Sequence, residues 1–219
     1  MPPQKPQAAR GRPRKLTDDA VVDGAIELIA TDGFAALSTR SLAERLGIRS
    51  SMLYTYFESL DEIAEAALSR MLLPIRVPSL ADAAHPIDEL VGFFEAHREL
   101  LIVYPEAIPA RLDSAPWAQM VGMVNSLLSQ FMGLGLSASR AAACYEALIG
   151  ITMASAATAR REQQASVNEV ELLLEGMDPA EVGALLRLRE WANEPADVRF
   201  RGTLRELVAW LLPALDRDE

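Results

Sequence analysis

The residues from Thr39 to Phe57 constrain the fold more tightly than any other part of this chain. Two short helices that cross closely need facing apolar residues, a small residue at the crossing and a sharp turn, where glycine most easily adopts a positive φ. The window supplies each of these: apolar Leu42, Leu46, Ile48 and Leu53, the small Ala43, and Gly47 for the turn. It therefore predicts a helix-turn-helix, with a first helix from about Thr39 to Leu46 and a second from Ser50 to about Tyr56.

The outer side of that second helix is too polar for a helix buried in a protein core. Its expected exposed residues are short, hydroxyl-bearing or cationic: Arg49, Ser50, Ser51, Thr55 and Tyr56. Such a surface fits the major groove of DNA, where Arg49 can pair with a guanine. Thr39 and Arg40 begin the supporting helix and are expected near the phosphates. The alternative, an ordinary helical hairpin in a bundle, accounts for Leu42 and Gly47 but not for this polar surface.

Apolar residues recur with helical spacing through the rest of the chain, and prolines separate the segments. A helix is expected over residues 17–31, and another opens at the capping-box pattern Ser59–Glu62 and ends near Leu73. Further helices are expected at residues 81–103, 105–112, 116–134, 138–162, 179–192 and 199–215, and residues 167–174 are open between a loop and a short helix. No segment shows the sustained alternation of a strand.

The expected fold class is therefore all-α, with about nine helices. We divide the chain into a flexible basic tail (residues 1–16), a helix-turn-helix head (residues 17–66) and a larger helical body (residues 67–219).

Charge is distributed unevenly along the chain. The net charge is −10, yet the first fifteen residues carry five cations and no acid. DNA responds to local potential, which decays within about 8 to 10 Å at physiological salt. A basic tail joined to an acidic body can therefore still bind nucleic acid, while the body repels DNA from the wrong face.

Several function classes lack support in this sequence. We find no phosphate-binding glycine loop and no nucleophile placed with a histidine, so an enzyme is not expected, and no cofactor is implied. His85 and His97 are too far apart to suggest a metal site, and the single Cys144 resembles a small buried residue. Charge or proline interrupts the longest apolar stretches, and the start of the chain lacks the apolar core of a signal peptide, so we expect a cytoplasmic protein without membrane contact.

The stretch from Phe34 to Ile63, FAALSTRSLAERLGIRSSMLYTYFESLDEI, resembles the DNA-binding domain of the TetR family of regulators. The resemblance implies that Tyr54 contacts a phosphate and that Tyr56 lies along the DNA backbone. Two positions depart from the family pattern. Arg49 replaces a serine, so capping of the next helix is expected to pass to Ser50, and Leu60 replaces a lysine that would contact phosphate.

The tail contains a second candidate DNA contact. Arg10-Gly-Arg-Pro-Arg14 resembles an AT-hook core, in which Arg12 and Arg14 would enter the narrow minor groove of A·T-rich DNA. A solvated basic tail is the alternative.

The resemblance also implies roles for the body. In the family, the last two long helices form a four-helix bundle with those of a second copy, and here they match Ser139–Arg161 and Arg199–Leu215. The first carries small residues such as Ala142, Ala143 and Ala156 beside Leu148, and the second carries an apolar stripe that includes Leu204 and Val208. Both sets are compatible with either a homodimer interface or core. A flexible and aromatic set suggests an apolar ligand cavity, although core packing explains it too: Phe93, His97, Tyr104, Trp117, Met120, Met123, Asn125 and Tyr145.

Together these features predict a ligand-responsive transcriptional repressor. It would bind double-stranded operator DNA as a homodimer and be released by a small lipophilic inducer of unknown identity. The alternative is a helical protein-interaction module whose DNA-binding head is degenerate, which Leu60 and the acidic balance would favour.

Overall fold

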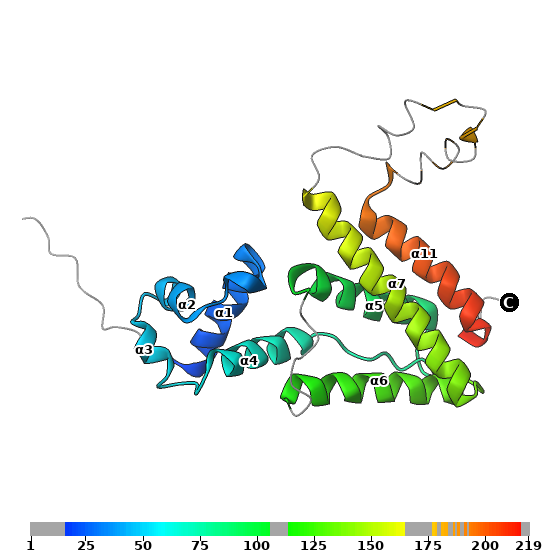
Figure 1. The fold of residues 1–219 in the computed structure, drawn as a ribbon. Coiled ribbons are helices and arrows are strands. Elements are labelled where there is room, and N and C mark those ends of the chain that lie inside the picture. The colour runs from blue at the N-terminus through cyan, green and yellow to red at the C-terminus, as the bar shows by residue number, and fades with distance from the viewer. Residues whose placement is uncertain are drawn as a thin grey trace, which may run out of the picture.

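The computed structural model describes residues 16–105, 114–164, 177–178, 181–183, 186, 188, 191 and 193–215. Every regular element within these residues is helical, which confirms the expected fold class. Figure 1 shows a small group of helices at one end and a larger group of long helices at the other. Residues 1–15 of the expected tail, the helix at 105–112 except Pro105, and residues 167–174 lie outside the described residues.

The head holds three helices and one short 3-10 turn. These are α1 (Asp18–Asp32), η1 (Phe34–Ala36), α2 (Thr39–Leu46) and α3 (Ser50–Leu53). Thr17 caps α1, because its hydroxyl accepts a hydrogen bond from the Ala20 N–H at 3.2 Å. Ser38 and Ser41 form a reciprocal capping box at the start of α2.

The body is built from longer helices, and α4 joins it to the head. The elements are α4 (Leu60–Leu72), α5 (Pro86–Val103), α6 (Ala115–Gly133), α7 (Ala138–Gln164), α11 (Ala196–Leu211) and η2 (Pro213–Leu215). Ser59 caps α4 as the sequence indicates. α5 begins at Pro86 rather than near residue 81, because proline favours the first helical turn. In Figure 1, α4 runs from the head towards the body, and α7 and α11 lie side by side.

Two glycines set the geometry of the head. A Cβ at Gly24 would lie 2.7 Å from Leu46 Cδ2, so the absence of a side chain lets α1 and α2 pack closely. Gly47 ends α2 with φ 66° and ψ 33°, the left-handed conformation that the sequence predicts for the turn.

We expect Gly47→Ala to lower the free energy of unfolding by about 1 kcal/mol, because an alanine pays a steric cost in the left-handed region. Gly92→Ala is the matched control, since this glycine lies within α5 and a Cβ there meets nothing within 4 Å. The control should raise stability by about 0.5 to 1 kcal/mol. Urea denaturation of both variants measures the free energy of unfolding. A Gly47→Ala protein as stable as Gly92→Ala would contradict the left-handed conformation at Gly47.

Candidate nucleic-acid interface

The crossing of α2 and α3 is built as the sequence predicts. Leu42, Ala43 and Leu53 are buried between the helices of the head. The Ile48 N–H donates to the Ala43 carbonyl at 3.0 Å, which closes the turn around Gly47. The buried side of this motif is therefore fixed by packing, and its other side is left to the solvent.

The residues predicted to contact DNA lie on that solvent side. The exposed members are Arg40, Arg49, Ser50, Ser51, Tyr54 and Thr55, while Thr39 and Tyr56 are half-buried. Tyr54 retains 58% of its accessible surface, an unusual exposure for an aromatic side chain. Met52, which the sequence reasoning did not single out, is also exposed on α3. The body does not cover this surface.

The second helix of the motif is shorter than predicted. α3 is α-helical only over Ser50–Leu53, after which the Tyr56 N–H donates to the Leu53 carbonyl in the tighter i→i−3 pattern. The expected cap at Ser50 is wrong: Arg49 occupies the N-cap position and supplies no side-chain hydrogen bond.

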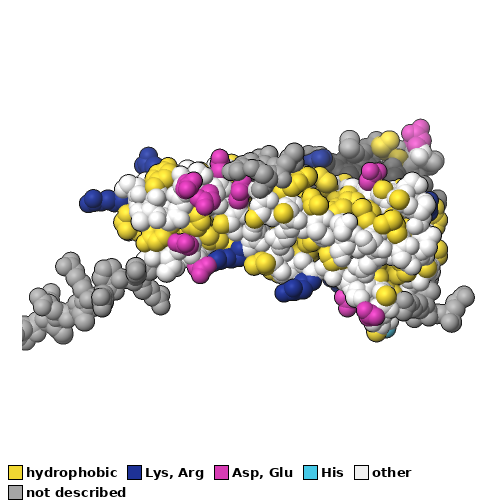
Figure 2. Space-filling model, turned by 90° about the horizontal axis from the view of Figure 1, so that it is seen from below, with side chains coloured by type: hydrophobic (Ala, Val, Ile, Leu, Met, Phe, Trp, Pro, Cys, Tyr) yellow, Lys and Arg dark blue, Asp and Glu magenta, His cyan; other side chains and the backbone are white. Residues whose placement is uncertain are grey.

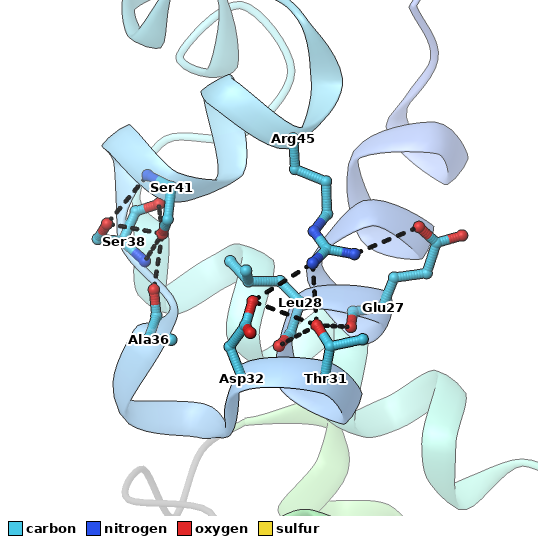
Figure 3. A network of polar contacts seen from close by, with 8 residues as sticks. All are labelled: Glu27, Leu28, Thr31, Asp32, Ala36, Ser38, Ser41 and Arg45. Carbon is cyan, nitrogen blue, oxygen red and sulfur yellow. Dashed lines mark hydrogen bonds and ion pairs between the residues drawn. The ribbon is translucent and has the colours of Figure 1, made fainter.

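Polar contacts hold α2 in place on α1 (Figure 3). Arg45 Nη2 donates to Thr31 Oγ1 at 2.9 Å and to Asp32 Oδ2 at 3.3 Å. The Ser41 hydroxyl donates to the Ala36 carbonyl at 2.6 Å. Arg45 therefore has a positioning role within the head, unlike Arg40 and Arg49.

Charge on the head favours an anion at its outer end. Arg40 and Arg49 make no ion pair with any residue that the structure describes. Figure 2 shows Arg side chains projecting at the end remote from the body, with carboxylates set further back. The free cations and the exposed hydroxyls thus share one surface, which suits a phosphate backbone.

Arg70 joins α4 to the head. Its guanidinium pairs with Asp23 at 2.6 Å and also with Asp19, both on α1. These two hydrogen bonds, with Asp19 the stronger cause, raise the pKa of Arg70. Phe34 makes a second link, because its ring centroid lies 4.5 Å from that of Tyr104 at the end of α5. The head is therefore attached to the body at two places, through which movement of the body can reach it.

Arg12 and Arg14, the candidate minor-groove contacts, lie outside the described residues.

The candidate ligand residues are only partly brought together. Phe93 and Tyr104 are buried, Asn125 is exposed on α6, and the others are half-buried: His97, Trp117, Met120, Met123 and Tyr145. The rings of Phe93 and His97 are 4.4 Å apart, whereas Tyr104 packs on Phe34. A pocket of about 490 Å³ is lined by Phe93 together with Pro74, Ile75, His85 and Asp88, but no other candidate lines it.

His97 is held as a neutral hydrogen-bonding group. Its Nδ1 lies 2.9 Å from the Phe93 carbonyl, so Nδ1 carries the proton and Nε2 is left as an acceptor. Burial lowers the pKa of His97 below its usual 6.5, and the bond to Phe93 opposes this only in part. Burial likewise raises the pKa of Tyr145, so its hydroxyl stays protonated at neutral pH.

We expect His97 to make the protein less stable as the pH falls from 7 to 5. The unfolded chain takes up a proton near pH 6.5 and the folded chain only at lower pH, so acidification favours unfolding, by about 1.4 kcal/mol for each unit between the two pKa values. In His97→Gln this part of the pH dependence should be lost. Unfolding at several pH values measures it, with His85→Gln at an exposed site as control. If the free energy of unfolding depends on pH in the same way in the wild type and in His97→Gln, burial of His97 does not contribute to the pH dependence of stability.

The candidate interface residues of the two long helices divide between core and solvent. Leu148, Ala156, Leu204 and Val208 pack into the chain's own core, the second of the two alternatives for these positions, whereas Ala143 is exposed. The exposed face of α7 is made of small residues one turn apart, namely Ala143, Ala147, Gly150 and Ala154, with Met153 beside them. Trp210 on α11 is 72% exposed. α7 is thus apolar on its exposed side as well as on its buried side, and periodicity alone does not show which of the two sides faces the core.

Comparisons with known proteins agree with this arrangement. The family described as "Bacterial regulatory proteins, tetR family" matches residues 21–67, and the predicted head spans residues 17–66. An HTH-type transcriptional regulator of Saccharopolyspora erythraea is 32% identical over 92 residues, covering 42% of this chain and 39% of that protein. The tetracycline repressor protein class A from transposon 1721 of Escherichia coli is 30% identical over 131 residues, covering 58% and 59%. The chain therefore spans between two fifths and three fifths of these relatives.

Solved structures share the fold over nearly the whole chain. The TetR family protein ActR of Streptomyces coelicolor, in complex with actinorhodin, superposes with a TM-score of 0.68 at 21% identity, covering 94% of this chain and 100% of that one. TetR from Acinetobacter baumannii AYE gives a TM-score of 0.61 at 19% identity, covering 92% and 100%.

Proposed function

Because the chain belongs to the TetR family of bacterial transcriptional regulators, we propose that it binds operator DNA as a homodimer and is released by a small lipophilic ligand. The observation that carries the proposal is the exposed face of α2 and α3. Exposed arginines and hydroxyls belong to both helices, and α2 and α3 lie at the end of the molecule away from the body (Figure 1).

On this proposal α3 enters the major groove. Arg49 pairs with a guanine, and Ser51 and Thr55 meet neighbouring base edges or phosphates. Tyr54 and Arg40 contact the DNA backbone on either side and fix the register. The arginines of the tail add a minor-groove contact.

The exposed faces of α7 and α11 support dimerisation. Cys144 Sγ lies 3.9 Å from the Leu211 carbonyl, which places the neighbouring Ala143 and Trp210 at the same level of the two helices. Small residues allow close helix approach, and a large exposed tryptophan supplies contact area. Two copies joined here give a two-fold assembly, so two heads can address half-sites about 34 Å apart.

The same surface bears on membrane contact. Residues Ala138–Glu162 form the one described helix that is long and apolar enough to cross a membrane, and 28% of its most apolar window is buried. One such helix is weak evidence for a span. We propose that a second copy of the chain, rather than lipid, covers its exposed small residues.

A small ligand in the body would release the DNA. The half-buried aromatic and methionine side chains between α5, α6 and α7 supply an apolar setting, and His97 Nε2 offers an acceptor for a ligand hydroxyl. The contacts of Arg70 and Phe34 join the head to the body, so a ligand that shifts α4 or α5 changes the spacing of the two heads. DNA would weaken ligand binding by the same factor.

Salt-dependent binding to bulk duplex DNA tests the proposal against a degenerate head. We expect the logarithm of the binding constant to fall steeply with the logarithm of salt concentration, since several phosphates are neutralised. Fluorescence anisotropy measures the slope. Binding that is absent or independent of salt would favour a protein-interaction module instead.

A further inference from the structure

Arg98 on α5 is the only buried charged side chain among the residues that the structure describes, with 6% of its surface exposed. A guanidinium keeps its charge at any ordinary pH, and removing a charge from water is costly unless an opposite charge compensates for it. Arg98 therefore needs an explanation that packing alone does not give.

The partners of Arg98 within the chain are neutral. Its Nε donates to Ser155 Oγ on α7 at 2.9 Å, and its guanidinium lies 5.2 Å from the centre of the Phe200 ring on α11. No described carboxylate lies within ion-pair distance of it, and its two Nη groups donate to no described residue. A hydroxyl and an aromatic ring orient the guanidinium but leave its charge unpaired.

Arg98 lines a pocket where α5, α7 and α11 meet. The pocket has a volume of about 380 Å³, and its lining also includes the apolar Ile102, Ala159 and Ala196 and the acidic Glu162 and Asp197. No described side-chain nitrogen or oxygen is both enclosed and without a partner. The unpaired Nη groups must therefore remain accessible, and the pocket that Arg98 lines is the place where they can be reached.

Two other charged pairs lie around this pocket. Glu162 Oε1 pairs with Arg199 Nη2 at 2.5 Å, and Arg201 Nε pairs with Glu95 at 2.7 Å. Asp197 lies in the first turn of α11, where the helix dipole favours a negative charge, and close enough to Arg201 to interact with it. Arg98 is thus the one buried cation among the described residues at this site, and it makes no ion pair with a described residue.

We propose that this pocket binds a small monocarboxylate with a compact apolar body, whose two oxygens accept hydrogen bonds from both Nη groups of Arg98. A guanidinium presents parallel donors that match a carboxylate, and Ser155 and Phe200 hold this one ready. The apolar walls would take the body of the ligand, and the volume lies within the range of small-molecule sites. The pocket shares no residue with the aromatic set proposed for the inducer, so this site goes beyond the proposed function and does not require it.

Calorimetric titration of the full-length protein with sodium benzoate tests the site, with benzamide as a neutral molecule of the same shape. We expect benzoate to bind and benzamide to bind at least tenfold more weakly. Arg98→Gln should weaken benzoate binding by at least tenfold, and Ala196→Leu should do the same by filling the pocket while Arg98 stays intact. Arg205→Gln, an exposed arginine paired with Asp88, is the matched control and should bind like the wild type.

The outcomes separate clearly. Benzamide binding as tightly as benzoate, or benzoate binding unchanged in both Arg98→Gln and Ala196→Leu, would overturn the site. So would wild-type protein that binds no benzoate at millimolar concentration. If Arg98→Gln fails to fold, Ala196→Leu decides alone. DNA is absent throughout, so failure here leaves operator binding untouched.

Discussion

Replacing Arg49 by alanine is expected to weaken operator binding about 10- to 100-fold while leaving the thermal unfolding temperature within a degree or two of the wild type. Arg49 is exposed, makes no ion pair with a described residue and stands at the N-terminus of α3. A bidentate arginine–guanine contact contributes about 1 to 3 kcal/mol of discrimination, so its loss falls on specific binding. Titration of the promoter region of the protein's own gene in a gel-shift assay measures the effect.

The controls distinguish base reading from simple loss of charge. Arg205→Ala removes another exposed arginine, which lies on α11 rather than in the head, and should bind DNA like the wild type. Tyr54→Phe should weaken binding to all sequences alike, since a phosphate contact carries no sequence information. Unchanged DNA affinity in Arg49→Ala would contradict a place for α3 in the interface. So would an equal loss of DNA affinity in Arg49→Ala and Arg205→Ala.

Trp210→Glu is expected to raise the dimer dissociation constant by about 30-fold or more and to weaken operator binding with it. A large exposed tryptophan at the centre of an interface commonly contributes 2 kcal/mol or more, and a carboxylate placed there would be buried without a partner. Because one head alone covers only a half-site, the monomer should bind DNA far more weakly. Sedimentation velocity measures the assembly.

Val121→Glu is the matched control for this prediction. Val121 is also an exposed apolar residue, but it belongs to α6 rather than to α7 or α11. The Val121→Glu variant should leave the dimer intact. Equal sedimentation of Trp210→Glu and wild type as dimers would place the interface elsewhere.

Local rules predicted the head well. The apolar pair Leu42 and Leu53, the turn at Gly47 and the cap at Ser59 all depend on residues close in sequence, where spacing and backbone preference decide the structure. The sequence did not predict that α3 is short or that Arg49 begins it without a side-chain cap. The choice between an α-helical and a tighter turn after Leu53 depends on the path of the chain from α3 to α4, which local spacing does not determine.

The body was harder to predict for a different reason. α7 is apolar on more than one side, so periodicity alone did not show that Leu148 faces the core and Ala147 the solvent. The site at Arg98 needs Ser155 and Phe200 from two other helices. Nothing in the local sequence around Arg98 indicates that it is buried, since arginine is usually exposed.

Chemical footprinting on the promoter of the protein's own gene tests most directly whether the outer face of α2 and α3 lies in duplex DNA. We predict two protected half-sites related by two-fold symmetry, with centres about 10 base pairs or a multiple of that spacing apart. In the Arg49→Ala protein, protection from cleavage should weaken equally at the two half-sites. A single protected stretch without symmetry, or protection that persists unchanged in Arg49→Ala, would contradict the account.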